Sequence, residues 1–146
     1  MPRVELLTVA NHAEAINGLL YLSGAGWTDL RRPIPPDGPL PPTHMGVGVA
    51  IQVPWAETNY QHTVGLRIES ADGVILMQVQ GQFEIGRPPG LAPGSDLRTV
   101  LAFTSDIVFP AAGIYRVVAS VAEDSRSVTF RVHDVPVQPM PRLPGL

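Results

Sequence analysis

The sequence predicts an all-β fold, a single antiparallel β-sandwich, on the basis of three observations. Apolar residues recur at every second position in several segments, the pattern of strands with one buried face. Glycine, proline and polar turn residues separate these segments at intervals of about 8–14 residues. No segment has a convincing helical period. We expect about eight strands in an immunoglobulin-like, Greek-key arrangement, with a small closed β-barrel as the alternative that fits the same alternation.

The first elements are the least regular part of the chain. Two segments, 3–10 and 18–30, predict strands. Asn11 is suited to cap a short helical turn over residues 11–17, between these strands. Two glycines inside the second segment indicate a bulge or a close backbone approach.

The middle of the chain is the most regular. Segments 45–53, 62–70 and 75–85 each alternate apolar residues with small or polar ones. The Ala71-Asp72-Gly73 turn joins the last two, because glycine adopts positive φ without steric cost. These two segments form the hairpin that the sequence predicts most clearly.

Three further strands are expected over 98–109, 114–122 and 126–134. Between the first two, the spacing of Pro110, Gly113 and Tyr115 is typical of a tyrosine corner. In that motif of Greek-key sandwiches a tyrosine hydroxyl bonds back to the preceding turn.

Two proline-rich segments stand out in the domain organisation, one inside the predicted domain and one after it. Residues 1–134 form one predicted sandwich domain, which contains a proline-rich inter-strand loop at 31–42. Residues 135–146 form a proline-rich C-terminal tail that we expect to be partly ordered. Both compositions favour polyproline II over packed strands.

The composition of the 146-residue chain excludes several chemistries. It has no cysteine, which excludes disulfides, a thiolate nucleophile and cysteine-based metal sites. All ten basic residues are arginine, which excludes Schiff-base and phosphate-loop lysines. A net charge of -3 with interspersed signs predicts no nucleic-acid or membrane partner. The start of the chain lacks the apolar run of a secretory signal, so we expect a cytoplasmic location.

Candidate binding residues gather in two connections. Trp55 and Tyr60 lie in a polar loop, where exposed aromatic rings can stack on a sugar or anchor a partner. For Trp55 we favour the other interpretation, in which the ring folds back over the open end of the sandwich. His62 shares the parity of an apolar strand face, which favours a satisfied histidine at the rim of the core over a base or ligand. Arg87 lies in the rigid loop 86–94, which is either a preorganised recognition element or a stiff crossover between sheets.

No catalytic constellation is visible. No serine lies in a Gly-x-Ser-x-Gly elbow, and nothing in the spacing of the carboxylates indicates an acid–base pair. The histidines, His12 and His44 among them, are far apart in sequence, so a metal site needs a coincidence of the tertiary structure. We therefore expect no enzyme activity, no cofactor and no metal.

The motif Gly86-Arg87-Pro88-Pro89-Gly90, together with several others along the chain, resembles motifs of a family of small bacterial β-proteins of unknown function, frequent in actinobacteria. The resemblance covers most of residues 3–132, and its most specific motif is Gly86-Arg87-Pro88-Pro89-Gly90. Arginine without lysine agrees with the GC-rich coding of such a source. The resemblance implies an immunoglobulin-like sandwich and no assigned activity. The other matching motifs are Val4-Glu5-Leu6-Leu7, Leu22-Ser23-Gly24-Ala25-Gly26-Trp27-Thr28, Val53-Pro54-Trp55, His62-Thr63, Phe83-Glu84-Ile85 and Pro110-Ala111-Ala112-Gly113-Ile114-Tyr115.

These observations favour a non-enzymatic interaction module that binds a protein partner or another copy of itself. The alternative is a small-ligand or carbohydrate-binding domain that uses Trp55, Tyr60 and His62, and a hydrolase-type enzyme is the third hypothesis. Self-association would use apolar residues on nominally outer strand faces. These residues are Leu7, Val9, Leu76, Val100, Ile114 and Val118.

Overall fold

The computed structural model describes residues 1–137, 144 and 145. These residues contain nine strands and one short 3₁₀ helix, η1 (Trp55–Glu57). The strands are β1 (Arg3–Ile16), β2 (Leu19–Ala25), β3 (Asp29–Ile34), β4 (Thr43–Val53), β5 (Gln61–Ser70), β6 (Ile75–Glu84), β7 (Leu97–Ile107), β8 (Gly113–Val121) and β9 (Asp124–Pro136). No helix in this described part is long and apolar enough to cross a membrane.

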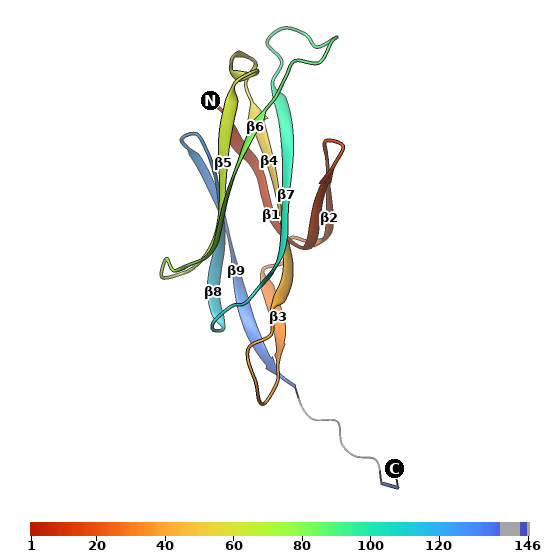
Figure 1. The fold of residues 1–146 in the computed structure, drawn as a ribbon, viewed down its shortest axis with the longest axis vertical. Coiled ribbons are helices and arrows are strands. Elements are labelled where there is room, and N and C mark those ends of the chain that lie inside the picture. The colour runs from red at the N-terminus through yellow and green to blue at the C-terminus, as the bar shows by residue number, and fades with distance from the viewer. Residues whose placement is uncertain (138–143, 146) are drawn as a thin grey trace.

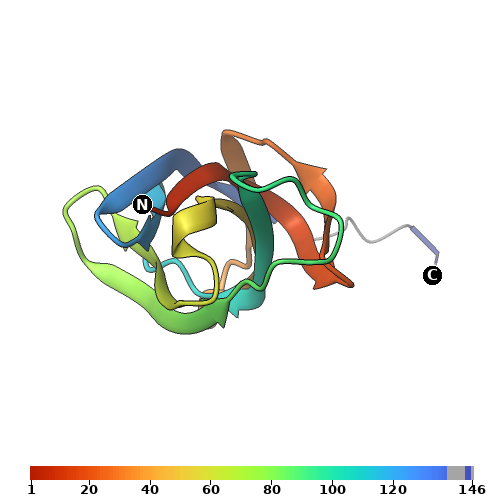
Figure 2. The same cartoon turned by 90° about the horizontal axis from the view of Figure 1, so that it is seen from above.

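The strands form two sheets that pack against one another (Figure 1). One sheet has the order β2-β1-β4-β7, and the other has the order β3-β9-β8-β5-β6. Seen from above, the sheets curve around a common interior (Figure 2). The prediction of an all-β, two-sheet fold is confirmed, with nine strands in place of about eight.

One strand pair departs from the predicted antiparallel arrangement. The segment 18–30 is not one strand: it divides into β2 and the start of β3, and Gly24 and Gly26 near the break both have positive φ. β3 then pairs with β9 in parallel, with Arg32 opposite Asp134. The Arg32 side chain is buried and its Nε donates to Asp134 Oδ1 over 2.6 Å. A parallel partner far along the chain leaves no local pattern, which is why the alternation alone did not indicate it.

The boundaries of the two proline-rich segments differ from those that the sequence predicts. β3 continues through Pro33 to Ile34, so the connection to β4 covers 35–42 in place of 31–42. β9 continues to Pro136, two residues past the predicted end of the domain. The sequence predicts that the C-terminal tail is partly ordered. Most of this tail, residues 138–143 and 146, lies outside the described residues.

The predicted helical turn over residues 11–17 is wrong, because β1 continues as a strand to Ile16. Asn17 and Gly18 form the two-residue turn to β2, with φ values of 50° and 75°. Near its start β1 has a register shift between Val4 and Leu6. An extra residue of this kind reverses the side-chain parity, so Leu7 faces the core together with Val4.

The β1–β2 hairpin folds over the outer face of β4 and β7. A Cβ atom at Gly46 would lie 2.5 Å from the backbone nitrogen of Ala13, and one at Gly48 would lie 2.8 Å from Cδ2 of Leu22. The hydroxyl of Thr104 on β7 accepts from the Ala13 N–H over 3.0 Å and donates to its carbonyl over 2.7 Å. The glycines of β4 therefore make room for the hairpin.

The core lies between the two sheets and ends in an aromatic cluster. The inward face of β4 is buried along its length, as its alternation predicts. Phe109, Tyr115 and Phe130 pack together, with the Phe109 and Tyr115 ring centroids 4.8 Å apart. The Tyr115 hydroxyl donates to the Ala111 carbonyl over 2.6 Å, which confirms the predicted tyrosine corner.

The sandwich is closed along one side and open along the other. Where β1 passes β9, the N–H of Val4 donates to Asp124 Oδ2 over 2.7 Å, and Arg126 Nη1 donates to the Glu5 carbonyl over 2.7 Å. On the opposite side β6 and β7 each end a sheet. Neither has a further strand partner within the described residues. This open side positions the first candidate site.

Candidate functional site

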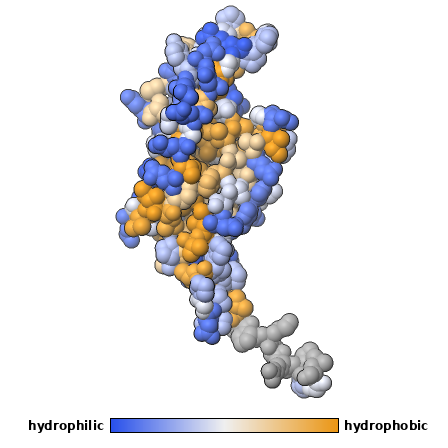
Figure 3. Space-filling model, in the orientation of Figure 1, coloured by the Kyte–Doolittle hydropathy of each residue, from blue (hydrophilic) through white to orange (hydrophobic). Residues whose placement is uncertain are grey.

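A hydrophobic groove lies on the open side, which we call the β6–β7 groove. Its cavity measures about 180 Å³. Figure 3 shows a band of hydrophobic surface down the middle of the molecule, and Figure 1 places β6 and β7 on this face. Gln80 is the one polar residue in the lining. The lining residues are Val49, Val64, Leu66, Val79, Gln80, Gly81, Leu101, Ala102 and Phe103.

The groove exists because the core is incompletely covered here. Val64, Leu101 and Phe103 pack against the core but remain partly exposed, and Val79 is 39% exposed. Gly81 faces inward, opposite Val64, and contributes no side chain. A Cβ atom built there would lie 3.8 Å from Val64 Cγ1, an ordinary van der Waals distance. Gly81 therefore leaves a notch that a side chain could occupy.

The two edges of the groove offer backbone hydrogen-bonding groups. In an antiparallel edge strand, alternate residues direct their N–H and C=O groups away from the paired neighbour. Natural edge strands are commonly protected by proline or by charges in mid-strand. β6 and β7 contain no proline, and their charges, Glu84, Arg98 and Asp106, lie within two residues of a strand end. Both edges are therefore suited to pair with another strand.

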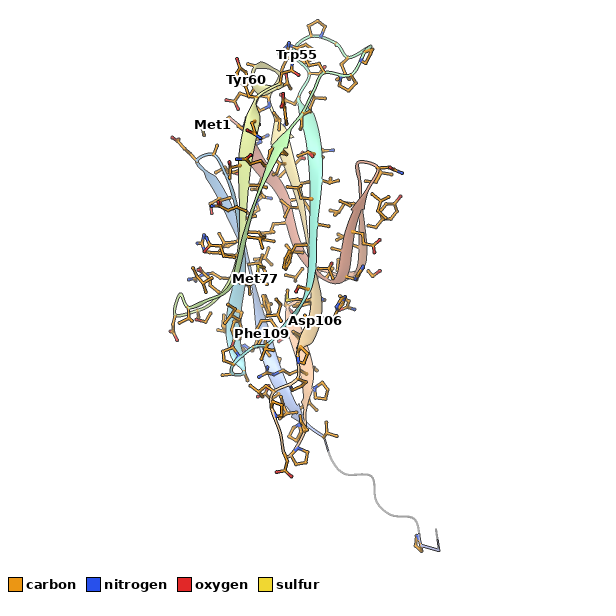
Figure 4. All side chains as sticks on the ribbon, viewed as in Figure 1. Met1, Trp55, Tyr60, Met77, Asp106 and Phe109 are labelled. Carbon is orange, nitrogen blue, oxygen red and sulfur yellow. The ribbon has the colours of Figure 1, made fainter. Side chains whose placement is uncertain are left out.

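The residues predicted as a binding site lie at the upper end of the molecule, around η1 (Figure 4). The guanidinium carbon of Arg87 lies 4.1 Å from the centroid of the Trp55 ring. Arg87 also donates to the Thr58 hydroxyl over 2.6 Å and to the Trp55 carbonyl over 2.7 Å. These contacts attach the start of loop 86–94 to η1. Trp55 is half-buried beneath Arg87 and is not among the residues that pack against the core.

His62 and Tyr60 complete the predicted set. His62 is half-buried, its Nε2 lies 2.8 Å from the Glu57 carbonyl, and its ring centroid lies 5.4 Å from that of Phe83. Because a carbonyl can only accept, Nε2 carries the proton. This is the satisfied histidine at the core rim that its parity favours. Tyr60 is 64% exposed. The structure thus brings Trp55, Arg87 and His62 around η1, but with their polar contacts made inside the chain.

Sequence reasoning missed a second cluster, on the outer side of β1, β4 and β7. His12 and His44 face one another, and each also contacts a carboxylate, Glu14 and Asp106 respectively. The strand register, in which Ala10 lies opposite Gly46, continues to place His12 beside His44. That signal becomes readable only once β1 is known to extend past residue 10. Among the described residues, no group of three or more metal-binding side chains is arranged to hold an ion.

Ion pairs occupy the outer face of the five-stranded sheet. Glu69 is buried between Arg67 and Arg116, and hydrogen bonds from Arg116 and then Arg67 lower the pKa of its carboxyl. On β3, the hydrogen bond from His133 is the main cause that lowers the pKa of Asp29. These pairs are satisfied within the chain and carry no evident chemistry.

The predicted self-association patch is largely covered. Leu7, Val9 and Val118 are buried, because the bulge in β1 turns the first two inward. Ile114 remains 43% exposed. The six residues therefore do not form one continuous exposed surface, and the prediction of this patch is wrong.

The fold and the groove define a small β-sandwich protein with one open side. The chain belongs to a family of unknown function (DUF6941), whose model matches residues 5–133. This match confirms that a family of unknown function spans most of the chain. No curated protein matches the sequence.

Proposed function

We propose that the protein is a non-enzymatic interaction module that binds an extended segment of a protein partner along the β6–β7 groove. The observation that supports this proposal is a hydrophobic groove flanked by two sheet edges that have no further strand partner in the described part of the chain. The partner segment adds as a β-strand, so its backbone pairs with an edge while every second side chain enters the groove.

The chemistry of the groove specifies the kind of segment. Inward side chains would be apolar, and one of them would fill the notch at Gly81. Outward side chains would lie beside Gln78, Gln80 and Gln82, so uncharged polar residues suit those positions. Alternating apolar and uncharged polar residues are therefore the expected sequence of the partner.

The alternatives have less support. A small-ligand or carbohydrate site at Trp55, Tyr60 and His62 would have to displace Arg87 from the Trp55 ring. The cavity beside His62 measures about 360 Å³, within the usual range of roughly 300–1,000 Å³ for a ligand pocket, but neither Trp55 nor Tyr60 lines it. A hydrolase would need a base, and the Nε2 atom of His62 already contacts the Glu57 carbonyl. With the interaction role we also propose an immunoglobulin-like strand arrangement, a bacterial source and a cytoplasmic location.

A displayed library of random decapeptides tests the proposal. We expect selection against the full chain to enrich peptides with alternating apolar residues, and bound peptide to slow amide exchange at the edges of β6 and β7. Val79→Arg places a charge in the groove and should abolish binding, whereas Val74→Arg, at a 60% exposed valine in the β5–β6 turn, is the matched control.

Gly81→Val separates binding from folding. The Cβ of the new side chain would lie at an ordinary van der Waals distance of 3.8 Å from Val64 Cγ1, and valine favours a strand, so the variant should keep or gain stability while it loses peptide binding. Enriched peptides that bind Val79→Arg and Gly81→Val as well as the wild type would contradict the proposal. Light scattering that shows a dimer, lost in Val79→Arg, would identify a second copy as the partner.

A further inference from the structure

Four side chains form a continuous chain of contacts across β1, β4 and β7. Glu14 Oε1 lies 2.9 Å from His12 Nε2, and His12 Nδ1 lies 3.0 Å from His44 Nε2. His44 Nδ1 in turn lies 2.8 Å from Asp106 Oδ1. Figure 4 labels Asp106, near the lower end of β7. The order along the chain of contacts is carboxylate, imidazole, imidazole, carboxylate.

The two imidazoles meet edge to edge. Their planes differ by 11° and their centroids are 5.3 Å apart, whereas the facing nitrogens of His12 and His44 are only 3.0 Å apart. Since the nitrogen lone pairs lie in the ring planes, the inner nitrogens point at one another.

The hydrogen bonds to the carboxylates determine what occupies the inner nitrogens. Each carboxylate can only accept, so the outer nitrogen of each ring carries the proton of the neutral imidazole. His12 Nδ1 and His44 Nε2 then both present lone pairs over 3.0 Å. Two facing lone pairs at this distance repel, so the contact needs either a proton on one ring, which makes an N–H···N hydrogen bond, or a metal ion shared between the two rings.

We propose that His12 and His44 bind a divalent cation of the zinc class through these inner nitrogens, with water as the remaining ligands. Imidazole is a preferred ligand of Zn²⁺, Cu²⁺ and Ni²⁺, and metal-bound histidines usually donate their other N–H to a carboxylate. Glu14 and Asp106 are those orienting carboxylates, one for each ring.

The dimensions and the exposure suit such an ion. Zinc at 2.0–2.1 Å from two nitrogens in a tetrahedral arrangement separates them by about 3.3 Å, against 3.0 Å between the rings, and lies to one side of the line that joins them, so both rings turn toward the ion when it binds. The side chains of His12 and His44 are 42% and 54% exposed, which leaves room for this rotation and for water ligands. The bound ion would connect the β1–β2 hairpin to β4.

Calorimetric titration of the full chain with ZnCl₂, and with MgCl₂ as the hard-cation control, tests the site. We expect one zinc ion per chain, no response to magnesium, and a rise in the melting temperature with zinc. His12→Ala should abolish saturable binding. Glu14→Gln and Asp106→Asn should each weaken it by about 10–100-fold, because the amide that replaces each carboxylate lacks the negative charge that orients the imidazole and raises its basicity.

His133→Ala is the matched control. His133 also contacts a carboxylate, Asp29 over 2.6 Å, but faces no second imidazole in the described part of the chain. Its replacement should leave zinc affinity unchanged, and circular dichroism checks that each variant folds. Absence of saturable binding at millimolar zinc, or equal affinity in His12→Ala and wild type, would overturn the proposal. The first result would mean that the two rings share a proton.

Discussion

Replacement of Gly46 by alanine should selectively disrupt the packing of the β1–β2 hairpin. The new Cβ atom would lie 2.5 Å from Ala13 N, 2.8 Å from the carbonyl carbon of His12 and 2.9 Å from Ala13 Cβ. Two of these atoms belong to the backbone, so no side-chain rotation relieves the contact. To restore an ordinary distance of 3.4 Å, the hairpin must retreat by about 0.9 Å.

The expected cost follows from what this retreat disturbs. Overpacking of this kind costs about 1–3 kcal/mol. The two hydrogen bonds between Thr104 and Ala13 lengthen, at roughly 1 kcal/mol for each bond lost. Lower entropy of the unfolded chain offsets about 0.4–1 kcal/mol. We expect a net loss of about 2–3 kcal/mol, or about 10 °C in melting temperature for a domain of this size.

Two further glycine-to-alanine variants calibrate the measurement by urea denaturation. At Gly48 the added atom meets the ends of the Leu22 and Leu20 side chains, which can rotate, so the loss should stay below about 1 kcal/mol. At Gly81 the added atom makes only an ordinary van der Waals contact, 3.8 Å from Val64 Cγ1, and stability should hold or rise by up to about 1 kcal/mol. If Gly46→Ala proves as stable as Gly81→Ala, the hairpin does not pack on β4 as described.

Two other predictions concern the outer sheet face and the tyrosine corner. Because Arg116 and Arg67 lower the pKa of Glu69 in the folded state, its contribution to stability is complete above the unfolded pKa of about 4.3 and is lost as the pH falls through the lower folded value. Urea midpoints measured between pH 7 and pH 3 should therefore fall less steeply in Glu69→Gln than in the wild type, and parallel curves would refute the assignment. Tyr115→Phe removes the hydroxyl that donates to the Ala111 carbonyl and should lower the free energy of unfolding by about 1 kcal/mol. If the variant has the melting temperature of the wild type, this hydrogen bond does not stabilise the fold.

The parts of the fold that the sequence predicts well are those determined by neighbouring residues. The β5–β6 hairpin follows from alternation and from the Gly73 turn, and the tyrosine corner follows from the spacing around Tyr115. The start of β1 was harder, because one extra residue between Val4 and Leu6 reverses the parity of everything after it. Over residues 11–17 the capping preference of Asn11 predicts a helical turn. The strand forms there instead, because Ala13 packs closely against Gly46.

The candidate sites were less accessible from sequence because they depend on which strands end the sheets. Leu101 and Phe103 alternate as buried residues do, and nothing local indicates that their strand has a free edge. His12 and His44 are 32 residues apart, and they meet through the part of β1 where the sequence predicts a helical turn. Trp55, Tyr60 and His62 are neighbours in the sequence, but the contact of Arg87 with Trp55 comes from a loop 32 residues further along and leaves no local pattern.

The closed side of the sandwich has a mechanical consequence. β1 starts at the upper end of the molecule and β9 finishes at the lower end, so the two strands run in the same direction (Figure 1). Tension applied through the ends of the chain would slide β1 along β4, and β9 along β8 and β3, instead of peeling the strands apart one bond at a time. Many ladder bonds must then break together. Such a domain unfolds slowly under tension, because the rate of forced unfolding, and not the equilibrium stability, determines its resistance.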